Sequence, residues 1–102
     1  MAITVNTNPL EVFRTDTGQT DGNEVIYQLD PNTTYTVDCV VTSAGTASLK
    51  IMVDSTKPTD FSAFSVANDG TQAANFTREV TGCSYVGLDV ASGTWTVKVR
   101  RV

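Results

Sequence analysis

Histidine is absent from the 102-residue sequence, and its absence removes the side chain that most often acts as a general base near neutral pH. The sequence also lacks a Gly-x-Ser-x-Gly turn, a Ser-x-x-Lys pair and a glycine-rich phosphate-binding loop. Glycoside hydrolysis needs two carboxylates facing one cleft, whereas Asp38 and Asp89 fall on outward faces of different predicted strands. These absences predict a protein that is not an enzyme, with no catalytic or cofactor-binding residues.

Long apolar runs are also missing, so no segment is predicted to span a membrane. The first ten residues, MAITVNTNPL, have neither a basic region nor an apolar stretch of the signal-peptide kind, which predicts synthesis in the cytoplasm without a signal peptide. Seven basic residues against 11 acidic ones give a net charge of −4. A chain this acidic has no general attraction for nucleic acid or for an anionic membrane.

Cysteine is scarce, with two residues that allow at most one disulfide. The strand pattern turns Cys39 toward the core and Cys83 outward, and a cytoplasmic origin disfavours a disulfide bond. We therefore expect two free thiols, one of them buried among apolar side chains.

What the sequence does have is alternation of apolar and polar residues. Residues 34–53, TYTVDCVVTSAGTASLKIMV, alternate on both sides of a turn at residues 43–45, in which Gly45 is expected to adopt a positive φ. This pattern predicts a central hairpin with one buried face, including Cys39 opposite Leu49. On its outer face the same register places Asp38 opposite Lys50.

Residues 84–101 predict a second, closing hairpin with a two-residue turn at Ser92 and Gly93. Its inward side pairs Val90 with Trp95, so the tryptophan is expected in the core. Its outward side brings Tyr85 next to Arg100, with Asp89 and Lys98 nearby. These assignments follow only from the rule that successive residues of a strand point to opposite faces.

Shorter strands are predicted at residues 10–14, 24–29, 61–66 and 72–80, with polar loops or turns at residues 15–23 and 67–71. Ile3 and Val5 alternate in residues 1–9, which we interpret as an N-terminal arm or an edge strand. No window shows a helical period. The sequence therefore predicts one all-β domain over residues 1–102, a single antiparallel β-sandwich of seven to eight strands. The period alone does not separate a jelly roll from an immunoglobulin-like strand order, but the long polar connection followed by two hairpins favours a jelly-roll-like order.

The polar loop at residues 15–23 is a candidate site for a calcium ion. Asp16, Asp21, Asn23 and Glu24 could supply oxygen ligands. Their spacing matches no EF-hand, and Asp, Asn and Gly are ordinary loop residues. We therefore expect no metal site.

The candidate interaction surface follows from the basic residues. Lys98, Arg100 and Arg101 crowd the last strand of an acidic protein, and two interpretations stay open. The charges could protect an exposed sheet edge against unwanted pairing, or they could complement an acidic surface on another copy or another protein. The full candidate surface comprises Lys98, Arg100, Arg101, Tyr85, Asp89, Ile3 and Val5.

Two stretches carry recognisable strand motifs: the L-x-P-x-T-x-Y-x-V run at residues 29–37, and YVGLDV at residues 85–90 followed by G-x-W-x-V-x-V at residues 93–99. Both resemble the corresponding strands of carbohydrate-binding-module-like jelly rolls. Together they cover about half of the chain and carry no ligand-binding residue. The chain, as a short threonine-rich jelly roll without a predicted signal peptide, also resembles accessory virion proteins of tailed phages. Capsid decoration proteins and tail or fibre modules are of this kind.

The second resemblance implies a non-enzymatic virion structural protein, made in the host cytoplasm and located in the virion. Such a protein would be a capsid decoration or cement protein that binds the capsid surface, or a tail protein, as a homo-oligomer. The alternative is a carbohydrate-binding or host-receptor-binding module of a tail or fibre, in which Tyr85, Arg100 and Asp89 would contact a glycan.

Overall fold

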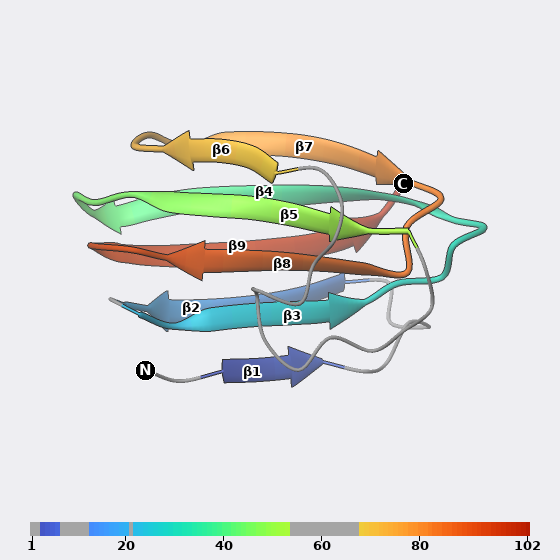
Figure 1. Ribbon diagram of the computed structural model, residues 1–102, viewed down its shortest axis with the longest axis horizontal. Helices are drawn as coiled ribbons and strands as arrows, with labels where there is room; N and C mark the ends of the chain where they lie inside the picture. Colours follow the sequence, from blue (N-terminus) through green and yellow to red (C-terminus); the bar gives the residue numbers. More distant parts are fainter. Residues whose placement is uncertain (1–2, 7–12, 21, 54–67) are drawn as a thin grey trace.

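The computed structural model describes residues 3–6, 13–20, 22–53 and 68–102, and these residues form nine strands in two layers (Figure 1). The strands are β1 (Ile3–Asn6), β2 (Phe13–Gln19), β3 (Glu24–Gln28), β4 (Thr34–Ser43), β5 (Ala47–Met52), β6 (Asn68–Gln72), β7 (Phe76–Thr81), β8 (Tyr85–Val90) and β9 (Thr94–Arg101). A five-stranded sheet has the order β1-β3-β8-β5-β6, and a four-stranded sheet has the order β2-β9-β4-β7. The described residues include no helix long and apolar enough to cross a membrane.

The strand order is that of a jelly roll. Strands β2 and β9, β3 and β8, β4 and β7, and β5 and β6 pair antiparallel, so the chain forms nested pairs around the β5–β6 connection. Successive pairs lie in alternate sheets. Pairing of β4 with β9 and of β5 with β8 then joins the pairs within each sheet. The predicted all-β, jelly-roll-like sandwich is confirmed.

Strand β1 departs from the antiparallel pattern. It lies at the edge of the five-stranded sheet and pairs in parallel with β3. Residues 3–6 of the predicted arm or edge strand therefore form an edge strand, and they add a ninth strand to the seven or eight that the pattern predicts. Two polar segments are also strands where the sequence predicts a loop and a turn. Strand β2 extends through residues 15–19, and β6 occupies residues 68–72.

Both predicted hairpins are wrong. Strand β4 lies in the four-stranded sheet and β5 in the five-stranded one, and β8 and β9 are divided in the same way. Each turn is therefore a β-arch, a connection that crosses from one sheet to the other. Asp38 lies opposite Lys98 of β9 and Thr77 of β7 rather than opposite Lys50. The expectation fails because a hairpin and an arch require the same alternation of buried and exposed residues.

The two arches lie against each other at one end of the sandwich. A Cβ added to Gly45 would approach the Ser92 carbonyl oxygen to 2.1 Å, and one added to Gly93 would approach the Ser43 oxygen to 2.4 Å. Gly93 has a φ of 79°, whereas Gly45 does not take the positive φ that the hairpin required. Gly45 is needed for close approach of the two backbones instead.

Hydrogen bonds hold this contact together. The Thr46 carbonyl accepts from the backbone N–H groups of Ala91 and Ser92 at 3.0 and 3.1 Å, and the Thr46 N–H donates to Ser92 Oγ at 3.0 Å. These bonds satisfy backbone groups of the connections that leave the sheet ladders.

Trp95 is the largest fully buried side chain, with an exposed fraction of 0%, as the sequence predicts. Its indole N–H donates to the Ser92 carbonyl at 3.3 Å, and its ring meets Phe76 edge-on with centroids 5.9 Å apart. Inward-facing residues from both sheets surround it. The buried cluster is Val25, Tyr27, Leu29, Tyr35, Val37, Cys39, Ala47, Leu49, Phe76, Val80, Cys83, Val86, Leu88, Val90, Trp95, Val97 and Val99.

Several individual expectations need correction at strand ends. Val53, predicted inward at the end of the first hairpin, is 55% exposed because β5 ends at Met52. Cys83, predicted outward, is buried because it lies before β8 begins and does not follow that strand's parity. Both cysteines are free thiols. The predicted strand at residues 61–66 lies outside the described residues.

Replacing Trp95 with alanine should cost about 3–5 kcal/mol of unfolding free energy, because it leaves a large cavity between the sheets. Urea unfolding followed by circular dichroism measures this loss. Val102→Ala, at a side chain that is 77% exposed, is the control and should change stability by less than about 0.5 kcal/mol. A Trp95→Ala loss as small as that of the control would contradict the burial.

Gly45→Ala should cost about 1–3 kcal/mol, because the new methyl group would meet backbone atoms that cannot rotate away. Gly82→Ala is the matched control: its added Cβ meets nothing within 4 Å, but its φ of 75° is strained for alanine. Gly93→Ala combines both penalties and should be the least stable of the three in urea unfolding. Wild-type stability in Gly45→Ala would show that the arches do not approach each other this closely.

Candidate interaction surface

The two outer faces of the sandwich differ in what covers them. On the five-stranded sheet, Ile26, Met52 and Tyr85 point away from the interior, yet they form a second buried cluster. On the four-stranded sheet, the described outward-facing side chains of β4, β7 and β9 are half-buried or exposed. Among the described residues, the open sheet face is therefore the outer face of the four-stranded sheet.

The predicted candidate surface is not a single surface. Tyr85, expected outward beside Arg100, is only 4% exposed. It belongs to β8 of the five-stranded sheet, together with Asp89, while Lys98 and Arg100 belong to β9 of the four-stranded sheet. Because the Ser92–Gly93 turn is an arch, the outward sides of β8 and β9 face opposite directions.

Ile3 and Val5 belong with the first of these groups. They lie in β1, where their Cα partners are Glu24 and Ile26 of β3. The structure thus separates Ile3, Val5, Tyr85 and Asp89, on one sheet, from the three basic residues on the other.

Strand β9 is an internal strand, flanked by β2 on one side and β4 on the other. Charges on an internal strand have no unpaired backbone edge to protect. The interpretation of Lys98, Arg100 and Arg101 as edge protection is therefore wrong. All three side chains are exposed, and we refer to them as the basic cluster.

Asp38 neutralises part of the basic cluster. Its Oδ2 accepts from Arg100 Nη2 at 3.2 Å and from Nε at 3.3 Å, while Thr77 Oγ1 donates to Oδ1 at 2.9 Å. The Arg100 side chain is 50% exposed and that of Asp38 22% exposed. Such a surface pair contributes about 0–1 kcal/mol to stability, so its main effect is to fix the position of both side chains.

Lys98 lies directly opposite Asp38 in the β4–β9 register. No hydrogen bond or ion pair joins its ammonium group to another described residue. In the part of the chain that the structure describes, Lys98 is thus a cation beside a carboxylate that Arg100 and Thr77 already occupy. Its charge is available to a partner.

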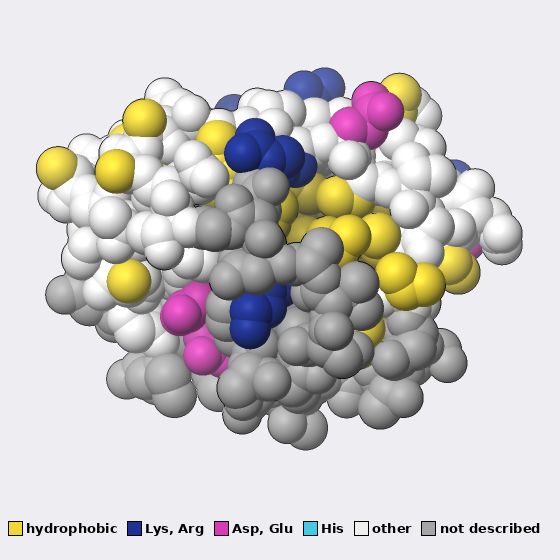
Figure 2. Space-filling view, turned by 45° about the horizontal axis from the view of Figure 1, so that its top comes forward, with side chains coloured by type: hydrophobic (Ala, Val, Ile, Leu, Met, Phe, Trp, Pro, Cys, Tyr) yellow, Lys and Arg dark blue, Asp and Glu magenta, His cyan; other side chains and the backbone are white. Residues whose placement is uncertain are grey.

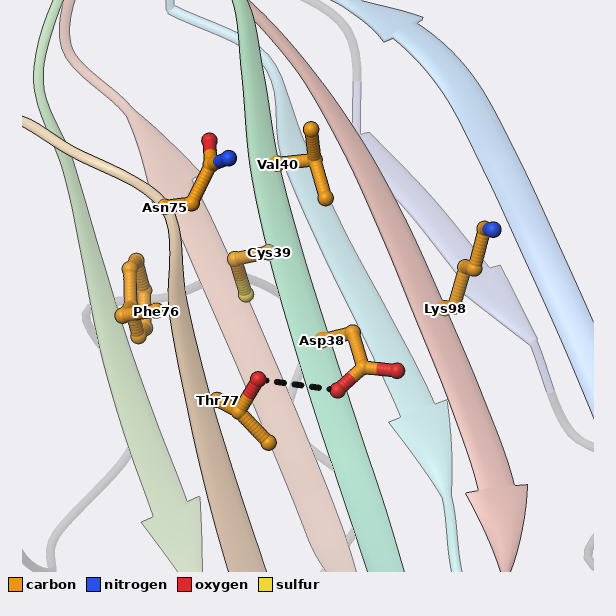
Figure 3. A pocket seen from close by; sticks show the side chains of 7 residues that line it. All are labelled: Asp38, Cys39, Val40, Asn75, Phe76, Thr77 and Lys98. Carbon is orange, nitrogen blue, oxygen red and sulfur yellow. Dashed lines mark hydrogen bonds between the residues drawn. The ribbon is translucent and has the colours of Figure 1, made fainter.

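A shallow hollow of about 330 Å³ opens next to Lys98 on this face (Figure 3). The strands that form it are β4, β7 and β9, and Asn75, directly before β7, borders it. The Val41 N–H donates to Asn75 Oδ1 at 2.8 Å, close to the bulge that interrupts the β4–β9 ladder after Val41. The lining residues are Asp38, Cys39, Val40, Asn75, Phe76, Thr77 and Lys98.

Side chains of both charges are visible on the other side of the molecule. In Figure 2, which views the upper edge and front of Figure 1, described Lys and Arg side chains occur at several places, and Asp and Glu side chains lie at the upper right and the lower left. Asp89 lies on that side of the sandwich, in the five-stranded sheet. Partial burial raises the pKa of its carboxyl group, and the Lys50 ammonium partly opposes the shift.

The part of the chain that the structure describes shows neither a group of metal ligands nor an activated thiol. Among the described residues, no three His, Cys, Asp or Glu side chains are grouped as metal ligands. Of the calcium candidates, Asp16 lies in β2 and Glu24 in β3, which belong to different sheets, and Asp21 lies outside the described residues. Burial raises the pKa of the Cys83 thiol, so the reactive thiolate is disfavoured.

Sequence reasoning missed the residues that complete this face: Asp38, Val40, Asn75 and Thr77. Asp38 and Val40 do alternate outward in residues 34–42, and that is the local signal for them. Nothing local indicates that β4 lies between β7 and β9, because the Asp38–Arg100 contact joins residues 62 positions apart.

No family model matches the chain, and no curated protein matches its sequence. Among solved structures, the chain is similar to PliG of Aeromonas hydrophila, a periplasmic lysozyme inhibitor of g-type lysozyme. That match has a TM-score of 0.51 and 11% identity and covers 99% of this chain and 100% of PliG. It supports the β-sandwich fold.

A second similar structure is the pre-peptidase C-terminal domain of collagenase from Bacillus anthracis. Its TM-score is 0.46 with 15% identity, and the match covers 98% of each chain.

Replacing Asp89 with asparagine should make the protein slightly more stable at pH 7. Because the folded-state pKa of Asp89 lies above the ordinary value of 3.8, ionisation disfavours the folded state. The stability due to the protonated form is present below pH 3.8 and is lost as the pH rises through the folded pKa. The gain in Asp89→Asn should therefore vanish at pH 3.

Urea unfolding at pH 3 and pH 7 measures this difference. Glu79→Gln, which removes one negative charge at an exposed position, controls for the change in net charge. An Asp89→Asn protein that is less stable than the wild type at pH 7 would contradict the desolvation argument.

Proposed function

We propose that this chain is a non-enzymatic interaction protein that binds an acidic surface of another protein through the outer face of its four-stranded sheet. In the specific form of the proposal, it is a virion component of a tailed phage: a capsid decoration or tail protein that acts as a homo-oligomer. The partner is a capsid or tail protein.

The observation that carries the proposal is the position of the basic cluster on an internal strand. The outward positions of β4, β7 and β9 carry the cations Lys98 and Arg100 and the carboxylates Asp38 and Glu79. Arg78 and Arg101 instead fall at positions of the inward-facing set, because their Cα partners are the buried residues Val37 and Tyr35. The outward charges sum to 2 − 2 = 0 in a protein whose net charge is −4, so this face repels an acidic partner less than the net charge of the molecule would.

The flat face is a better docking element than the adjacent edge strand. If β7 paired antiparallel with β7 of a second copy, two registers would use most of the strand. The two-fold axis would pass through Arg78 in one register and through Glu79 in the other. Each register places a residue opposite its own copy, so like charges would meet. The β7 edge is therefore poorly suited to pairing with a second copy, and contact through the face is favoured.

The virion part of the proposal is supported by the resemblance of a short, threonine-rich jelly roll to accessory phage proteins. The glycan alternative has less support, because every aromatic side chain that the structure describes is buried. These are Tyr27, Tyr35, Phe76, Tyr85 and Trp95. A sugar-binding face normally offers an exposed ring, and Tyr85, Arg100 and Asp89 do not share a face.

Lys98→Glu combined with Arg101→Glu should weaken binding to the partner by about tenfold or more, mainly by slowing association. The measurement is co-sedimentation of the purified protein with capsids and tails of the virus that encodes it, at low and high salt. Lys50→Glu reverses one charge on the other sheet and is the control for each of the single variants Lys98→Glu and Arg101→Glu; it should leave binding nearly unchanged.

Wild-type binding should also weaken as salt is added, because exposed charges are screened. Sizing with light scattering gives the oligomeric state. A strict monomer that sediments with neither capsids nor tails would overturn the proposed function, and equal losses in the double variant and in Lys50→Glu would overturn the assignment of the face.

A further inference from the structure

We propose that the hollow between β4, β7 and β9 is a binding site for the carboxylate of an Asp or Glu side chain on the partner protein. Lys98 Nζ would supply the charge, Asn75 Nδ2 a hydrogen bond, and Val40 an apolar contact. This inference rests on the proposed function and goes further, because it names the residue type on the partner and the place where it binds.

The hollow offers donors rather than acceptors. Both carboxylate oxygens of Asp38 already accept hydrogen bonds, Oδ1 from Thr77 and Oδ2 from Arg100. A basic group from a partner would therefore compete with Thr77 and Arg100 for Asp38. The charged residues that line the hollow are Lys98 and Asp38, whose formal charges cancel, and Arg100 adds a cation next to it through its pair with Asp38.

Asn75 is oriented by the backbone. Its Oδ1 accepts from the Val41 N–H at 2.8 Å, so the amide oxygen is occupied and the NH₂ group is left as a donor. In Figure 3 the Asn75 nitrogen points toward the side where Val40 lies. The backbone contact therefore fixes which end of this side chain a ligand would meet.

The apolar part of the hollow suits the stem of an acidic side chain. Val40 is half-buried and lies between Asn75 and Lys98 in the view of Figure 3. The methylene groups of a glutamate could pack on it while the carboxylate meets the two donors. A volume of about 330 Å³ accommodates one such side chain together with its flanking backbone.

Arg101 allows this site to be distinguished from the basic cluster as a whole. It carries the same charge as Lys98 on the same strand, but it is not among the residues that line the hollow. Loss of charge at Arg101 tests general electrostatic attraction, whereas loss at Lys98 tests the hollow.

The probe is the peptide acetyl-Gly-Gly-Glu-Gly-Gly-amide, and its Gln counterpart is the uncharged control. In an NMR titration of isotope-labelled protein, the Glu peptide should shift the Asn75 side-chain amide and the Val40 methyl signals, and the Gln peptide should not. Lys98→Gln should weaken binding of the Glu peptide by about fivefold or more, and Arg101→Gln by less than about twofold, since a group in direct contact matters more than one at the rim.

Asn75→Asp tests the hydrogen bond without disturbing the fold. The aspartate keeps an oxygen that can accept from the Val41 N–H, but it replaces the NH₂ donor with a second, negatively charged oxygen. Binding of the Glu peptide should fall by about tenfold, while the backbone spectrum and the urea midpoint stay close to those of the wild type.

The outcomes separate the site from the proposed function. No shift at the highest peptide concentration, equal losses in Lys98→Gln and Arg101→Gln, or unchanged binding in Asn75→Asp would each overturn the carboxylate site. Co-sedimentation with capsids or tails tests the function independently. Peptide binding with the expected variant pattern, but no binding to any virion component, would support the site and overturn the function.

Discussion

The close contact between the two arches at Gly45 and Gly93 determines how the sheets are composed. Because the β4–β5 and β8–β9 connections lie against each other, both cross between the layers at the same end of the sandwich. Strands β4 and β9 then become neighbours in one sheet, and β5 and β8 become neighbours in the other. Two glycines and the hydrogen bonds to Thr46 and Ser92 thus bring together strands that are about 50 residues apart. The set of side chains on each outer face follows from this strand arrangement.

Much of the fold could be predicted from the sequence because burial follows a period of two. Residues such as Val37, Leu88 and Trp95 are buried wherever their strands pair, since both a hairpin and an arch turn them inward. The pairing itself could not be predicted in this way. Only the close approach of Gly45 to Ser92, which is a tertiary contact, distinguishes the two alternatives.

The presence of arches instead of hairpins explains why the predicted candidate surface is wrong. The outward direction of Lys98 and Arg100 was predicted correctly, but their neighbours were not. With β8 in the other sheet, Tyr85 and Asp89 are replaced beside them by Asp38 and Thr77. Tyr85 shows a second reason for the failure: the outer side of the five-stranded sheet is buried at Ile26, Met52 and Tyr85, whereas period two alone assigns only one buried face to a strand.

Under the proposed function, Asp38 would give the face its selectivity. An isolated cluster of three cations would attract any anion and would be screened by salt. The Asp38–Arg100 pair instead fixes one cation in place and leaves Lys98 as the lining cation, next to Asn75, whose amide oxygen is held by the backbone. Under the proposed function, a partner would therefore have to supply a carboxylate at a defined position rather than negative charge in general. Because the hollow is shallow, Lys98 would keep part of its hydration in the proposed complex, which limits its desolvation cost, and specificity would arise from the geometry of the fixed neighbours.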